Sequence, residues 1–466
     1  MISVQNHRQL LNGNNFLIFV LVIFGSTSCA AKKITTTNKV EVAAIKTKSN
    51  IRTFSSAAEK KRYEDSIARI AVPFDLDKSK ENNSINNSNT NVSVGSVKVL
   101  NNDPNRIHNI AVLLPFNLDQ IPLGMYVDDS TKQLTAESKN AMEFYLGCQM
   151  ARQKFQSENL KTNVYFLDDR NDSLKVATIF TKKPFPNIDY VIGPIGYKNL
   201  KLAADLAKSN QIPLISPFAS SIYIKENSYF FNANASLYNQ YSFILDHTKN
   251  KFPNKILEVI YDGKDSSAEN ITFLKELADK YYSYSNIKYT SLRSIDDVGK
   301  TMNQSDTLSQ RIILIYSSKD IYVKSVIAKL KSVKNDLQIF TSAVAKNTKA
   351  LTDVKFPHDI FTVYSLNAGT INASIFSDRY EERYKRKPSD FANQGYDLML
   401  HLFNMLDKNQ NLQDYGKNYS LDFDNTQTRF QFKPVLNKAG NIDYYDNTFL
   451  YLYKYNGGGF SVVSPN

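Results

Sequence analysis

From residue 108 onward, short apolar runs alternate with segments of helical periodicity, and this alternation constrains the fold more than any other feature of the chain. The run IAVLLPF at residues 110–116 is apolar at successive positions and ends at a proline, as in a strand buried on both faces of a parallel sheet. Residues 136–158 then repeat apolar side chains every three or four positions, which predicts an amphipathic helix. Further strands are expected at residues 164–168, 190–194 and 212–217, with a helix at residues 200–209, so the series reads βαβαβαβ. Right-handed crossovers place such strands in an open, doubly wound sheet.

A second series of the same kind follows and predicts a second α/β lobe. Its expected helices and strands lie at residues 237–251, 255–262, 267–282, 287–292, 311–317, 321–333, 338–342 and 360–366. Two helical stretches come next, at residues 374–387 and 388–407, with Pro388 at the start of the second. Residues 429–463 alternate Tyr, Phe and Leu with polar residues, which predicts antiparallel strands with a turn at Gly457 to Gly459. The expected fold class is α/β, with two doubly wound lobes.

The start of the chain has the layout of an export signal. Residues 16–24 are nine consecutive apolar residues, too few to span a bilayer, and small residues lead from them to Cys29. We therefore expect a signal peptide over residues 1–28. A cysteine placed directly after the small residues resembles the lipobox of bacterial lipoproteins, in which the thiol is acylated; a plain secretory signal with an incidental cysteine is the alternative. The resemblance implies a lipid anchor at Cys29 and, with Ala30 and Ala31 beside it, an outer-membrane position facing the periplasm.

Residues 29–107 have the composition of a flexible tether. They contain few aromatic residues and an Asn- and Ser-rich stretch at residues 81–91, so they offer little apolar surface for a core. Residues 57–70 interrupt this pattern with helix-forming composition, which predicts a short helix that docks on the core, docks on a partner or remains solvated. The tether also carries 14 basic against 8 acidic residues, whereas the body after residue 107 has 42 against 37. The formal charge of +12 is therefore weak evidence for a nucleic-acid partner, and we expect none.

Four phrases of the body resemble type I periplasmic binding proteins, the class of the leucine/isoleucine/valine receptors. They are IAVLLPF, VIGPIGYKNLKLAADLAKSNQIPLISPFASS, VIYDGKDSSAENITFLKEL and KRKPSDFANQGYDLMLHLF, in this order over residues 108–466. The resemblance implies two lobes joined by three crossing segments, with ligand enclosed by hinge closure. It places lobe I at residues 108–233 and 367–418 and lobe II at residues 234–366 and 419–466. The crossings are expected near residues 232–234, 366–369 and after 419.

The resemblance also implies candidate ligand contacts. An amino-acid ligand needs hydroxyls and backbone N–H groups for its carboxylate, and an acid on the facing lobe for its ammonium group. Ser220 and Ser221, in the loop after the fourth strand, match the first need. Tyr197 stands in the loop after the third strand, where the serine cluster of the family does not recur. Asp262 follows the matching strand of lobe II, where it binds the ammonium group or only caps the next helix.

The sequence contains no catalytic or metal-binding motif that we recognise. Its five histidines show no metal-ligand spacing, and H-E-x-x-H, G-x-S-x-G, C-x-x-C and P-loop patterns are absent. Residues 168–172 form the one dense carboxylate group, which helix capping explains better than a metal does. His401 and Cys148 fall on apolar helix faces and are expected to be buried and inert. We therefore expect a protein that is not an enzyme, with no catalytic residue, no metal and no cofactor.

Two functions fit these features best. The first is a lipid-anchored envelope binding protein that encloses a small polar ligand, an amino acid or peptide-like molecule, as in amino acid transport. The second is a ligand-free scaffold or activator lipoprotein that contacts a cell-wall synthesis enzyme, which a resemblance to penicillin-binding-protein activators implies. The partner is accordingly a small polar ligand or an envelope protein.

Overall fold

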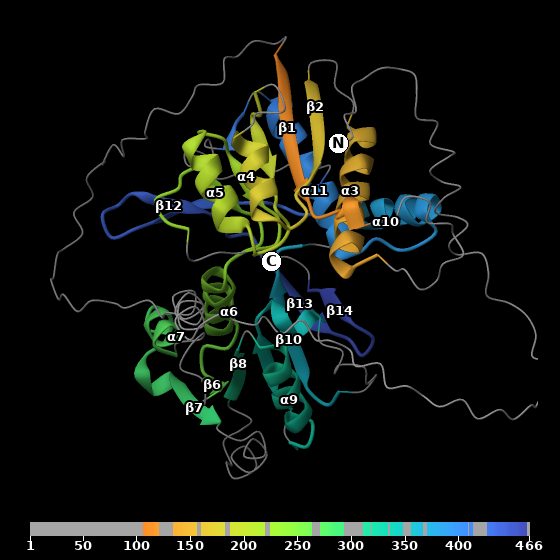
Figure 1. The fold of residues 1–466 in the computed structure, drawn as a ribbon. Helices are drawn as coiled ribbons and strands as arrows, with labels where there is room; N and C mark the ends of the chain where they lie inside the picture. Colours follow the sequence, from red (N-terminus) through yellow and green to blue (C-terminus); the bar gives the residue numbers. More distant parts are fainter. Residues whose placement is uncertain are drawn as a thin grey trace, which may run out of the picture.

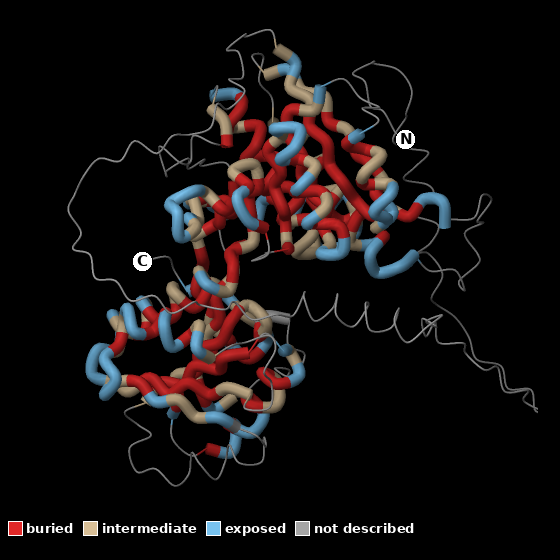
Figure 2. The backbone as a smooth tube through the Cα atoms, turned by 60° about the vertical axis from the view of Figure 1, so that its left-hand side comes forward, coloured by how far each residue is buried: buried red, intermediate tan, exposed pale blue. Residues whose placement is uncertain are grey.

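The computed structural model of the chain describes a two-lobed α/β body. The residues that it describes are 106–120, 134–155, 160–181, 187–219, 224–262, 271–292, 311–317, 319–333, 336–347, 356–366, 371–408, 410–412 and 426–463. The predicted signal peptide, Cys29, the tether and the helix at residues 57–70 lie outside this part of the chain. Figure 2 shows two separate buried cores with a narrow junction between them.

The first lobe is built on a seven-stranded sheet with the order β11-β12-β5-β4-β3-β1-β2 (Figure 1). Its strands are β1 (Ile107–Leu114), β2 (Lys161–Asp168), β3 (Tyr190–Ile192), β4 (Leu214–Ser216), β5 (Phe230–Asn232), β11 (Phe432–Leu436) and β12 (Ile442–Asn447). All neighbours pair in parallel except β11 and β12, which form an antiparallel hairpin. Both faces of β1 are enclosed, since residues 110–114 are fully buried, as the apolar run predicts.

Helices cover both faces of this first sheet. They are α3 (Ala136–Lys154), α4 (Ser173–Thr181), α5 (Leu200–Ser209), α10 (Ile371–Tyr384) and α11 (Asp390–Asp407), with the short helix η2 (Leu118–Gln120) after β1. Alternate residues of β1 enter different cores: Val112 packs with α3, α10 and α11, whereas Leu113 packs with α4 and α5. The lobe therefore has three layers, as expected for a doubly wound sheet.

The second lobe repeats this plan with the order β14-β13-β10-β9-β8-β6-β7. Its strands are β6 (Ile256–Asp262), β7 (Ile287–Leu292), β8 (Arg311–Tyr316), β9 (Gln338–Thr341), β10 (Asp359–Tyr364), β13 (Tyr451–Tyr455) and β14 (Phe460–Val462). Its helices are α6 (Leu237–Lys251), α7 (Ile271–Ala278), α9 (Asp320–Leu330), η3 (Tyr284–Asn286) and η5 (Ala343–Asn347). Helices α6 and α7 share one core with the sheet, and α9 packs in the other.

Hydroxyl side chains fix the start of three long helices. Thr135 accepts a hydrogen bond from the backbone N–H of Ser138 and so caps α3, and Ser236 caps α6 in the same way. Ser389 accepts from the N–H of Ala392 and caps α11, so this helix begins at Asp390 and Pro388 lies outside it. The expected position of Pro388 at the helix start is thus wrong by two residues.

The chain passes from one sheet to the other three times. The first crossing follows β5 and leads into α6, the second follows β10, and the third joins β12 to β13 through residues 448–450. The expected assignment of residues 419–466 to lobe II is wrong for residues 432–447, because β12 pairs in parallel with β5 of the first sheet. The alternation of residues 429–463 predicts strands but does not indicate which sheet edge they join.

Within the described part of the chain, no helix combines the length and the apolar character needed to cross a bilayer.

Candidate ligand-binding region between the lobes

The carboxyl ends of the parallel strands of both sheets point toward the junction of the lobes. In the first sheet β5 runs directly into the first crossing, and β4, β3, β1 and β2 are parallel to it. In the second sheet β10 runs into the second crossing, and β9, β8 and β6 share its direction. Figure 1 shows the same arrangement, with the two lobes stacked edge to edge. Open α/β sheets bind ligands outside the carboxyl ends of their strands, so the residues at these two edges form the candidate site.

The loop after β4 is fixed at its base by both neighbouring elements. The Phe218 carbonyl accepts a hydrogen bond of 2.9 Å from the Asn234 amide in the first crossing, and the Pro217 carbonyl accepts one of 2.9 Å from Gln394 in α11. The hydroxyl of Ser216 donates to the Ala219 carbonyl at 2.8 Å, closing the turn. Ser220 and Ser221, the predicted carboxylate contacts, lie just beyond this turn and outside the described residues.

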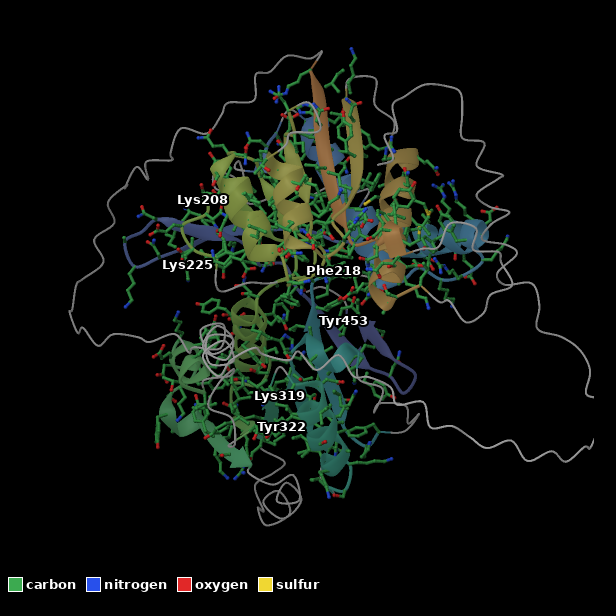
Figure 3. The ribbon with its side chains drawn as sticks, in the orientation of Figure 1. Lys208, Phe218, Lys225, Lys319, Tyr322 and Tyr453 are labelled. Atoms are coloured by element: carbon green, nitrogen blue, oxygen red, sulfur yellow. The ribbon has the colours of Figure 1, made fainter. Side chains whose placement is uncertain are left out.

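Aromatic rings gather where the two edges meet. Phe218 packs against Phe391 of α11 with ring centroids 4.5 Å apart. Tyr364, the last residue of β10, donates a hydrogen bond of 3.2 Å to the carboxylate of Asp390 at the start of α11, which links the second lobe to the first. Burial, followed by the charge of Asp390, raises the pKa of Tyr364 well above its usual value, so the phenol stays protonated. Figure 3 marks Phe218 on one lobe and Tyr453 on the other beside this junction.

Sequence reasoning missed the pair Tyr364 and Asp390. Asp390 reads as an ordinary acidic residue in the first turn of a helix, and Tyr364 as one of the many aromatic residues of a strand. The sequence shows that Tyr364 ends a strand, but Asp390 begins a helix that follows another helix, α10, so only the fold brings the two residues together.

Asp262 lies at the end of β6, as predicted, but it faces a cation of its own lobe. Its carboxylate oxygen is 3.9 Å from the Lys319 ammonium nitrogen, just before α9. The side chains are 22% and 45% exposed, so water screens this long ion pair. A ligand ammonium group would therefore have to compete with Lys319, while a ligand carboxylate could use that same lysine.

Tyr197 is placed at the carboxyl edge of the first sheet, in the turn that precedes α5. Its carbonyl accepts a hydrogen bond of 3.2 Å from the N–H of Leu200, and its side chain is 70% exposed. Leu174, at the start of α4, and Ile321, at the start of α9, are even more exposed, at 78% each. Helices α4 and α5 follow β2 and β3, and α9 follows β8, so these apolar side chains also stand at carboxyl-end edges.

Two carboxylates of residues 168–172 accept hydrogen bonds from backbone N–H groups, in their own loop and in the loop after β1. Asp168 accepts from the N–H groups of Asn117, Leu118 and Arg170, and Asp172 accepts from the N–H of Lys175 and caps α4. Burial raises the pKa of Asp169 to about 6. Among the described residues, no group of three His, Cys, Asp or Glu side chains is arranged to hold a metal ion.

Two groups that could suggest chemistry are buried in the first core. The His401 ring packs against Phe430 at 5.2 Å, and burial lowers the pKa of this histidine to about 3. Burial raises the pKa of the Cys148 thiol, which donates a hydrogen bond of 3.3 Å to the Gly395 carbonyl. A thiol kept protonated inside a core is not a nucleophile, as the helix pattern predicts.

The known proteins that this chain resembles share its fold. No protein-family model matches the sequence, and no curated protein matches it. A putative branched-chain amino acid ABC transporter protein from Rhodospirillum rubrum superposes with a TM-score of 0.57 at 16% identity, covering 77% of this chain and 100% of that one. An ABC transporter substrate-binding protein from Desulfitobacterium hafniense gives 0.52 at 15% identity, with the same coverage. Full-length LpoA from Haemophilus influenzae gives 0.50 at 13% identity, covering 77% of this chain and 59% of that one. The expected type I periplasmic binding protein fold is thus confirmed.

Proposed function

We propose that the chain is a lipid-anchored binding protein of the bacterial cell envelope that encloses a small polar ligand, an amino acid or peptide-like molecule, between its lobes. The observation that carries this proposal is that the carboxyl ends of the parallel strands in the two sheets face each other at the junction, where short crossings join the lobes. Donors and acceptors stand at both edges, among them Asp262, Lys319 and Asp390. Ser220 and Ser221 are the proposed carboxylate contacts from lobe I, and Tyr197 adds an exposed phenol to the same edge.

The proposal is supported by the substrate-binding proteins that share the fold, which include a Desulfitobacterium hafniense protein in complex with Leu, at a TM-score of 0.51 and 16% identity. In this chain, the long and partly exposed ion pair of Asp262 with Lys319 suits a zwitterionic ligand, whose carboxylate and ammonium groups would each find an opposite charge. The proposal includes a lipid anchor at Cys29. It also includes an outer-membrane position facing the periplasm, which rests on the residues after Cys29.

A thermal-shift screen of the full chain against amino acids and muropeptides tests this function. A ligand at a hundred times its Kd adds about 2.7 kcal/mol to the free energy of unfolding, which raises Tm by roughly 3 to 4 °C in a body of this size. Alanine at both Ser220 and Ser221, or Asp262→Asn, should reduce the shift, whereas Asp205→Asn is a matched control because that carboxylate pairs with Lys201 on the surface of α5. If no compound in the screen moves Tm, ligand binding of this class is excluded.

The second candidate, a scaffold or activator lipoprotein that contacts a cell-wall synthesis enzyme, has its own support. Leu174, Tyr197 and Ile321 are exposed large apolar side chains at the carboxyl-end edges, the kind of surface that protein partners cover. Photo-crosslinkers at Leu174 and Ile321 in intact cells should capture a synthase under this hypothesis, with Tyr284, an exposed residue just before β7 and so at the amino end of that parallel strand, as the control position.

A further inference from the structure

Asp446 lies at the meeting point of the first and third crossings. It is the penultimate residue of β12, two positions before residues 448–450 carry the chain into the second lobe. Its side chain is 1% exposed. One carboxylate oxygen accepts from the Asn232 amide at 3.0 Å and from the backbone N–H of Ser236 at 3.3 Å, and the other accepts from the Asn239 amide at 2.6 Å.

All three donors belong to the segment that leaves the first lobe. Asn232 ends β5, Ser236 caps α6, and Asn239 lies in the first turn of α6. The neighbouring residue Asn447 reinforces the connection, since its amide donates to the Ala233 carbonyl at 2.9 Å. The first and third crossings are thus held side by side by one buried carboxylate and one buried amide.

No lysine or arginine in the described part of the chain balances this carboxylate directly. Among the described residues, Asp446 forms no ion pair with a lysine or arginine, whereas the buried Glu258 pairs with Arg311 at 2.7 Å and Asp443 with Lys225 at 3.0 Å. The charged or titratable groups around Asp446 are Asp443 and Tyr444 on β12 and the exposed Lys433, which lies opposite it on β11. The facing residues of β5 and of the first turn of α6 carry no charge. Burial raises the pKa of Asp446 to about 7.

The amide of Asn232 offers an alternative arrangement. Its Nδ2 donates to Asp446, but its buried Oδ1 receives no hydrogen bond from any residue that the structure describes. A half-turn of the amide would present this oxygen to a protonated Asp446, which could then donate to it. The same protonation weakens the acceptors used by Ser236 and Asn239.

We propose that Asp446 is a proton-sensitive latch of the hinge, which holds the first and third crossings together when ionised and releases the start of α6 when protonated. Because these crossings set how the two lobes are joined, release widens the range of lobe orientations. The inference does not depend on which ligand or partner the protein has.

Amide hydrogen exchange on the full chain tests the latch at pH 8 and pH 5.5, with protection factors corrected for the chemical exchange rate. In the wild type, protection of the peptide over residues 230–240 should fall about fivefold at the lower pH, the equivalent of one net hydrogen bond. Asp446→Asn should show low protection at both pH values. Asp443→Asn, on the same strand but bonded to Lys225 and Glu226 within the first lobe, should keep the wild-type response.

Spin labels at Lys201→Cys in the first lobe and Tyr284→Cys in the second, in a Cys29→Ala background, report the lobe orientation directly; the buried Cys148 does not compete for label. The distance distribution should broaden at pH 5.5 in the wild type and be broad at both pH values in Asp446→Asn. Should Asp446→Asn not fold, Asn239→Ala removes the shortest bond and should broaden the distribution at pH 8. A wild-type distribution that is identical at the two pH values overturns the latch.

Discussion

Replacing Gly147 with alanine should destabilise the first lobe, because two helices touch there through their backbones. A Cβ atom added at Gly147 of α3 would lie 2.0 Å from the carbonyl oxygen of Ala392 in α11, and one at Gly395 would lie 2.3 Å from the carbonyl oxygen of Phe144. Real Cβ atoms keep at least 3.0 Å from such atoms, so α3 and α11 would have to separate by about 1 Å. Neither obstacle is a side chain that can rotate away.

The magnitude follows from two opposing effects. Overpacking a core costs up to about 3 kcal/mol when the backbone has to move. Alanine is better than glycine in a helix interior by about 1 kcal/mol. The expected net loss in the free energy of unfolding is therefore about 2 kcal/mol for Gly147→Ala. The helix displacement would also move Asp390 and Phe391, since α11 carries both to the junction of the lobes.

Urea unfolding followed by far-UV circular dichroism measures this loss, a suitable probe because the chain has no tryptophan. Gly459→Ala is the control, since an added Cβ there meets nothing within 4 Å. The reasoning is refuted if Gly147→Ala unfolds at the wild-type urea concentration or above it, because a closely packed helix pair cannot absorb the methyl group without cost.

Two further predictions use the buried histidine and the proposed anchor. His401 has a folded-state pKa far below the 6.5 of the unfolded chain, so only the unfolded state gains a proton as pH falls; the protein should lose about 2 kcal/mol of stability from this residue between neutral pH and pH 5. His401→Gln should flatten that part of the pH profile of denaturant midpoints, and an unchanged slope would contradict the assignment. Cys29→Ala should move the protein from the membrane fraction to the soluble fraction of fractionated cells; retention in the membrane would exclude acylation as the anchor.

Much of the fold could be predicted because apolar periodicity is a local property. The boundaries expected for α6 and β7 agree with those observed, and the helix over residues 136–158 is α3, four residues shorter. β5 was not predicted, whereas β3 and β4, which are equally short, lie within the apolar runs expected as strands at residues 190–194 and 212–217. The lobe of the hairpin β11 and β12 was predicted wrongly, because its parallel partner β5 lies more than 200 residues earlier in the chain.

The candidate site could be predicted only in outline. The sequence places Ser220, Ser221, Tyr197 and Asp262 after strands, and the parallel order of the sheet puts such positions at one edge. The pairing of Asp262 with Lys319 joins residues at the ends of β6 and β8, which are neighbours in the sheet but are separated in the chain by β7, so no local sequence pattern contains it.

The sequence by itself determined most of the strands and helices, and through their alternation the two-lobe plan, because each element depends on the spacing of apolar side chains along a short stretch of chain. Only the tertiary structure decided how residues from distant segments meet. It buries Asp446 among Asn232, Ser236 and Asn239, and it joins Tyr364 to Asp390 across the lobes. The physical reason is that burial and hydrogen bonding depend on which surfaces face each other after folding. The sequence shows that a residue is an aspartate, but not whether water or the residues of a hinge surround its carboxylate.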